Sequence, residues 1–120
     1  MNEDLHSHHG SFLVCPVPHQ LIEEARIVTK RLREEKKNKD LSKATLSIIV
    51  KVTENSLHYY FLRPIELMKL NFIAKGIVTM GVNAGVEVLK TFGGQLIGHL
   101  NEEQMKTLAD VIEDIFEEIP

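Results

Sequence analysis

The fold is decided by residues 73–90, IAKGIVTMGVNAGVEVLK. On a helix, the polar side chains of this stretch form one stripe at four-residue steps: Lys75, Thr79, Asn83 and Glu87. Apolar side chains and glycines cover the rest of the circumference. A helix of this kind is not an ordinary surface helix. We expect it either to be the central helix of a bundle or to bury one side in its own subunit and another side against a partner.

The two ends of the chain also have helical periodicity. Apolar residues recur every three or four positions over residues 19–38 and again over residues 101–119. Asn101 and Gln104 have the spacing of a capping box, in which each side chain bonds to the backbone of the other residue. The sequence therefore predicts a first and a last helix.

A second helix is predicted over residues 41–62, with Asp40 placed to cap it. The boundary with the third helix is expected at Arg63-Pro64, because the residue before a proline avoids helical backbone angles. Proline itself suits the first helical turn, so the third helix is expected to begin there.

Residues 46–62 admit a second interpretation. The run SIIVKV, residues 47–52, is β-branched and alternating, and TENS, residues 53–56, has the composition of a turn. A β-hairpin here would make the fold α+β. An isolated two-stranded hairpin is only marginally stable, however. We therefore predict an all-α four-helix bundle, with a hairpin at about residues 46–62 as the alternative.

Composition indicates one domain. The chain has 120 residues, a formal net charge of −3, one cysteine and no tryptophan. We expect residues 19–120 to form a single helical domain behind a flexible arm, residues 1–18, of which residues 12–14 dock on the body. A lone cysteine favours a cytoplasmic location. The most apolar run, residues 76–89, is too short to span a bilayer and contains Glu87, so no transmembrane segment is expected.

Charge is unevenly distributed along the chain. Residues 26–43 hold eight cations and three acids, a net charge of +5, whereas residues 101–120 hold seven acids and one lysine, a net charge of −6. We expect these segments to lie side by side within the bundle or to meet between subunits. No aromatic residue interleaves the basic segment for base stacking, so we do not expect nucleic acid as a partner.

The arm carries a set of potential metal ligands. Imidazole and thiolate groups suit zinc, nickel or copper. The candidates lie within fourteen residues: His6, His8, His9, Cys15 and His19. Their spacing matches neither a CxxC pair nor an HExxH helix, so a solvated polar tail is the competing interpretation.

Aromatic and polar groups also gather at the expected helix junction. They are His58, Tyr59, Tyr60 and Arg63. Such residues can line a pocket for a hydrophobic or lipidic ligand in a helical bundle, and simple packing at the junction is the alternative. The chain has no glycine-rich phosphate loop after a strand, no nucleophile elbow and no paired-cysteine zinc motif. We therefore expect no enzymatic activity and no required cofactor.

The glycine-bearing third helix carries the main functional hypothesis. Small residues one turn apart allow close helix contact, and Gly93-Gly94 is expected to weaken or end the helix. The expected interface is Ile77, Val78, Gly81, Ala84, Gly85 and Val88. We predict a small interaction or regulatory module that forms a homodimer or engages a protein partner. The alternatives are a metal-binding protein and a carrier of lipids or hydrophobic ligands.

Overall fold

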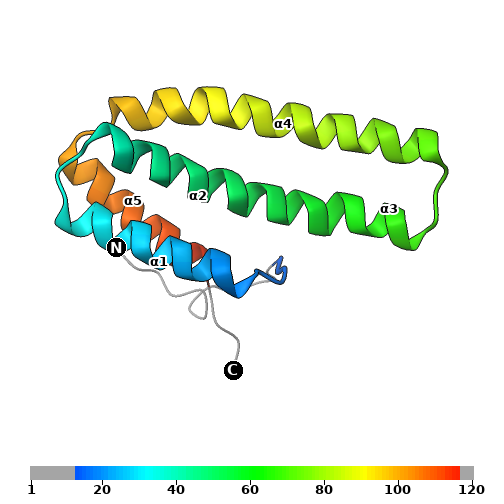
Figure 1. Ribbon diagram of the computed structural model, residues 1–120, viewed down its shortest axis with the longest axis horizontal. Coiled ribbons are helices and arrows are strands. Elements are labelled where there is room, and N and C mark those ends of the chain that lie inside the picture. The colour runs from blue at the N-terminus through cyan, green and yellow to red at the C-terminus, as the bar shows by residue number, and fades with distance from the viewer. Residues whose placement is uncertain (1–12, 117–120) are drawn as a thin grey trace.

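The computed structural model describes residues 13–116, which form helices and no strand. The elements in chain order are α1 (His19–Glu34), α2 (Lys39–Leu57), the π-helical segment η2 (His58–Leu62), α3 (Arg63–Leu67), α4 (Phe72–His99) and α5 (Glu102–Ile115). The elements α2, η2 and α3 follow one another without a break and form one rod (Figure 1). Residues 13–116 therefore contain four helical rods: α1, the α2–η2–α3 rod, α4 and α5. The all-α bundle is confirmed, and the alternative hairpin at about residues 46–62 is wrong.

A new element, α3, begins at Arg63 with Pro64 in its first turn, but it continues the second rod to Leu67, so the prediction that the long third helix begins there is wrong. Proline lacks an N–H group and its ring crowds the carbonyl four residues earlier, which usually ends or kinks an α-helix. Here the chain makes a wider π turn directly before Pro64. In this turn the Arg63 N–H donates to the carbonyl of His58, five residues earlier. The rod accommodates the proline and ends only at Leu67.

The third helix differs from its predicted span at both ends. It begins at Phe72, after the expected start, and runs through Gly93-Gly94 to His99. A β-carbon at Gly93 would stand only 3.0 Å from a methyl carbon of Leu46 on α2. The glycine thus allows α2 and α4 to approach closely, and this packing stabilises a stretch that sequence alone predicts to be weak.

Side-chain caps fix the starts of α2 and α5. In the predicted capping box, the Gln104 N–H donates to the Asn101 side chain at 2.8 Å and the Asn101 N–H donates to the Gln104 side chain at 2.9 Å. For α2 the predicted cap is wrong, because Asn38 accepts from the Leu41 N–H, at 2.8 Å. Asp40 lies in the first turn instead, where an acid suits the positive end of the helix dipole.

The core is formed mainly by α1, α2 and α5. Helix α2 packs against α4 on one side and against α1 on the other, and α1 packs along α5 (Figure 1). One residue of α4 joins the main cluster of buried side chains, which consists of Leu21, Ala25, Val28, Leu32, Leu41, Ile48, Ile97, Met105, Ala109 and Ile112. The central helix is therefore α2, and the expectation that the glycine-bearing helix is central is wrong.

The basic first helix and the acidic last helix lie side by side, as one of the charge interpretations predicted. Arg33 of α1 donates to Asp110 of α5 at 2.7 Å and also to Glu113. The hydrogen bond from Arg33 holds the pKa of Glu113 below its ordinary value. These pairs are partly exposed, so they fix the register of the two helices more than they add stability.

Candidate interaction surface

One side of α4 is apolar and uncovered. Apart from Val86 and Ile97, the residues of this helix are exposed or only partly buried, because α4 contacts the rest of the chain chiefly along α2 and η2. We define the open face of α4 as the exposed residues that share the side away from α2: Ile73, Ile77, Met80, Gly81, Ala84, Gly85, Val88 and Phe92. Helical spacing makes this face one continuous stripe.

The open face is large for a lone chain. Ile77 is 65% exposed, Met80 73% and Phe92 63%. The large side chains of the face together expose on the order of 700 Å² of apolar surface, against ~300–600 Å² for the largest patch on a typical monomer. This area is close to the ~800 Å² that each partner contributes to a standard protein interface.

The predicted interface residues fall on this surface. Ile77, Gly81, Ala84, Gly85 and Val88 are exposed, and Val78 beside them is half-buried. At Gly81 and Gly85 a β-carbon would meet nothing within 4 Å outside its own helix backbone. Each glycine costs a helix about 1 kcal/mol relative to alanine. Packing within the described chain therefore does not explain the two glycines, which leave a shallow strip along the helix.

The length and hydropathy of α4 also bear on the expectation of no transmembrane segment. That expectation rested on residues 76–89, whereas the helix spans 28 residues. Its most apolar window has a mean hydropathy of 1.4 and is 6% buried, so by length and composition alone α4 is able to cross a membrane. Lys75 and Glu87 stand within the helix, and the absence of a spanning segment stays a prediction.

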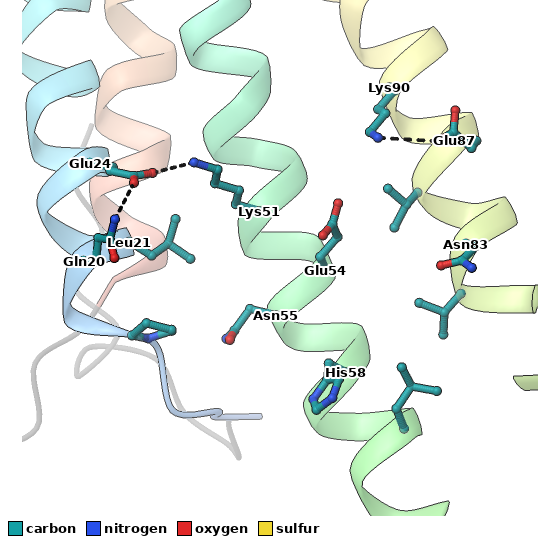
Figure 2. A pocket seen from close by; sticks show the side chains of 14 residues that line it. Gln20, Leu21, Glu24, Lys51, Glu54, Asn55, His58, Asn83, Glu87 and Lys90 are labelled. Atoms are coloured by element: carbon teal, nitrogen blue, oxygen red, sulfur yellow. Dashed lines mark hydrogen bonds and ion pairs between the residues drawn. The ribbon is translucent and has the colours of Figure 1, made fainter. Parts of the chain in front are cut away.

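An open groove of about 660 Å³, lined by both polar and apolar side chains, lies on the other side of α4, between this helix, α2 and the start of α1 (Figure 2). Its α2 wall carries Lys51, which donates to Glu24 of α1 at 2.8 Å. Its α4 wall carries Lys90, which lies 3.4 Å from Glu87. Both cations are thus engaged by carboxylates at the walls, and the groove is open to solvent.

The predicted aromatic pocket is not brought together as a unit. His58 lines the open groove between α1, α2 and α4. Tyr59 instead meets Tyr60 edge to face, with ring centroids 5.3 Å apart, and Arg63 lies 5.0 Å above the Tyr59 ring. The Tyr60 hydroxyl donates to the carbonyl of Val14, and loss of water around this hydroxyl raises its pKa. These three residues form a packed cluster rather than a cavity.

Two of the predicted metal ligands can be placed. His6, His8 and His9 lie outside the described residues. The thiol of Cys15 is half-buried, 3.7 Å from the Ser56 hydroxyl, and His19 is exposed beside Glu23. Within residues 13–116, no three His, Cys, Asp or Glu side chains are grouped to hold a metal ion. Metal binding by the arm stays a prediction.

The end of the predicted arm docks on α2. The Asn55 side chain donates to the carbonyl of Pro16 at 2.9 Å, and Tyr60 bonds to Val14 as described above. The side chains of Leu13 and Val14 are nevertheless 89% and 63% exposed, so the backbone makes this contact. The expected docking of residues 12–14 is thus seen at Val14, while residue 12 lies outside the described part of the chain.

Comparison with known proteins adds no further constraint. Among protein-family models, curated proteins and solved structures, none matches this chain. The function must therefore be inferred from the open face of α4 and from the groove behind it.

Sequence reasoning missed two features of the surface. The groove joins three helices, and no local pattern shows which polar residues face one another across it. The turn between α3 and α4, with its exposed apolar side chains, was not predicted, because the third helix was expected to begin at Arg63-Pro64. The run LMKLNF, residues 67–72, was the available indication of an apolar turn.

Proposed function

We propose that this protein is a non-enzymatic interaction module that self-associates through the open face of α4. The observation that carries the proposal is the continuous apolar stripe on α4, whose central glycines have no neighbours in the described chain. Exposed apolar surface of this extent marks an interaction site.

A second copy of the chain is the occupant that fits best. A two-fold contact uses the same patch on both subunits, so an apolar patch can cover itself without a complementary charged partner. Gly81 and Gly85 lie one turn apart at the middle of the stripe. Backbones can approach closely there, and large neighbours such as Ile77 and Met80 then pack around the crossing point.

The experiment is sedimentation of the full chain at micromolar concentration. We expect a dimer for the native sequence and for Gly85→Ala, because one methyl group still permits close approach. Gly85→Leu fills the crossing point and is expected to give a monomer. The matched control is Asn83→Leu, which adds the same side chain on the polar stripe of α4 and should remain a dimer. A monomeric native protein, or a dimer unaffected by Gly85→Leu, contradicts the proposal.

A further inference from the structure

The turn that joins α3 to α4 exposes apolar side chains at one end of the molecule. It lies at the far end of the α2–α4 pair, beyond the reach of α1 and α5 (Figure 1). The hairpin tip is defined here as five exposed residues: Phe61, Leu67, Met68, Leu70 and Phe72. Phe72 is 90% exposed, and Leu67 is 65% exposed. These side chains surround a projecting end rather than line a groove.

The backbone of the tip is ordered by its own hydrogen bonds. The Met68 N–H donates to the carbonyl of Pro64 at 2.9 Å, and the Asn71 side chain accepts from the Ala74 N–H at 2.8 Å to start α4. Between them Lys69 adopts a left-handed conformation with φ of 54°, which reverses the chain. Ile65 anchors the turn from inside, at 9% exposure. The apolar side chains are therefore presented by a formed turn.

The charges around the tip are mainly positive. Arg63, Lys69 and Lys75 are cations, and Glu66, 3.9 Å from Lys75, is the one acid in residues 61–77. This end of the molecule thus carries a net charge of +2 on a chain whose overall charge is −3. Long cationic side chains can extend toward lipid headgroups while neighbouring apolar side chains enter the acyl region.

From this shape and charge we propose that the hairpin tip inserts into the surface of an anionic lipid bilayer. A projecting apolar end needs a matching cavity in a protein partner, whereas a lipid surface adapts to any convex shape. Insertion is shallow, because Arg63, Lys69 and Lys75 lie among or beside the apolar residues and stay at the headgroups. The tip is separate from the centre of the open face at Gly81 and Gly85, so this proposal does not depend on self-association.

The test uses tryptophan reporters, since the chain contains no tryptophan. Phe72→Trp places a reporter in the tip, and Phe92→Trp places a matched reporter far along α4, at 63% exposure. Each is mixed with phosphatidylglycerol–phosphatidylcholine vesicles that carry brominated acyl chains. We expect the emission of Phe72→Trp to shift to shorter wavelength and to be quenched, and that of Phe92→Trp to stay unchanged.

Two further variants separate the apolar and the electrostatic contributions to vesicle binding. Met68→Ser combined with Leu70→Ser removes the apolar contribution and is expected to weaken vesicle binding about tenfold or more. Lys69→Glu reverses one charge and is expected to weaken binding to the anionic vesicles about tenfold, with little effect on pure phosphatidylcholine. Ile77→Glu, which targets self-association, should leave the Phe72→Trp response in place. Loss of self-association and loss of membrane binding can thus be distinguished.

Each of the following results contradicts the proposal. The first is an unchanged Phe72→Trp spectrum with anionic vesicles. The second is equal quenching of Phe92→Trp, or retention of the protein on vesicles in alkaline carbonate, because either result places the whole of α4 in the bilayer. The third is undiminished binding by the Met68→Ser, Leu70→Ser variant, which assigns lipid contact to another surface. A tip reporter that responds to a second copy of the chain without lipid also contradicts insertion.

Discussion

The ammonium group of Lys37, in the turn between α1 and α2, lies 2.8 Å from the carbonyl oxygen of Gly98 in the last turn of α4. It also donates to the carbonyl of Leu100, and the Lys37 backbone N–H donates to the Glu102 carboxylate at 2.8 Å. One residue therefore satisfies carbonyls at the end of α4 and an acid at the start of α5. This contact holds the two turns at the same end of the bundle together.

Loss of this contact is expected to destabilise the fold. Lys37→Met keeps the aliphatic stem and removes the donors, so the free energy of unfolding should fall by about 1 kcal/mol. Urea denaturation measures the change. The matched control is Lys36→Met, at the exposed neighbouring position, with an expected change within about 0.5 kcal/mol. Equal effects at both positions would count against a specific role for Lys37.

The pair of helices α1 and α5 is expected to respond to acid. Because Arg33 lowers the pKa of folded Glu113, this carboxylate stabilises the fold above its unfolded pKa of about 4.3. The contribution is lost as the pH falls through the lower, folded pKa. Arg33→Gln should therefore reduce stability at pH 7 by about 0.5–1 kcal/mol, the pair being partly exposed. The difference between the two proteins should vanish at pH 2–3, measured by denaturation at each pH; a constant difference contradicts this explanation.

Two glycines of α4 are expected to respond in opposite ways to alanine. Gly76→Ala adds a β-carbon where nothing lies within 4 Å, so it should stabilise the helix by roughly 0.5–1 kcal/mol. Gly93→Ala gains the same propensity but places its β-carbon 3.0 Å from Leu46, which must shift. We expect thermal denaturation to show a higher Tm for Gly76→Ala and an equal or lower Tm for Gly93→Ala. The opposite order contradicts the close approach of α2 and α4.

Self-association through α4 predicts a Tm that depends on protein concentration. Binding that occurs only in the folded state stabilises it by mass action. The native chain should melt at a higher temperature as its concentration rises from 1 to 100 µM, a range chosen to span micromolar dissociation constants. Ile77→Glu places a charge on the open face, so its Tm should be independent of concentration. A concentration-independent native Tm, with circular dichroism unchanged between the two proteins, contradicts the proposal.

Much of the fold follows from local sequence patterns. The apolar stripes of α1 and α5 and the capping box of Asn101 and Gln104 depend on neighbours within one or two turns, and they were predicted correctly. The break after the second rod was misplaced, because a π turn before Pro64 leaves no distinct trace in the sequence. The continuation of α4 past Gly93 depends on Leu46, a partner distant in the chain.

The sequence predicted that the glycine-bearing helix carries an apolar interaction surface. It did not predict which side of that helix remains exposed. A helix that is apolar on nearly every side does not reveal which side its own subunit covers. The structure shows that α2 covers the side of Val86 and Ile97 and that Ile77, Ala84 and Val88 remain exposed. Asn83 and Glu87 of the polar stripe line the open groove shared with α1 and α2, a position that the stripe alone does not predict.

The most direct test of self-association through α4 is a distance between two copies of Asn83. In a Cys15→Ser background, Asn83→Cys carries a spin label on the groove side of α4, away from the open face, so the label does not block the contact. Helix axes in contact are about 8–10 Å apart, so the two labels should lie within about 30 Å of each other. Pulsed electron paramagnetic resonance measures this distance. A main distance within that limit is the predicted result, and either no dipolar coupling or a distance beyond about 50 Å would contradict contact through α4.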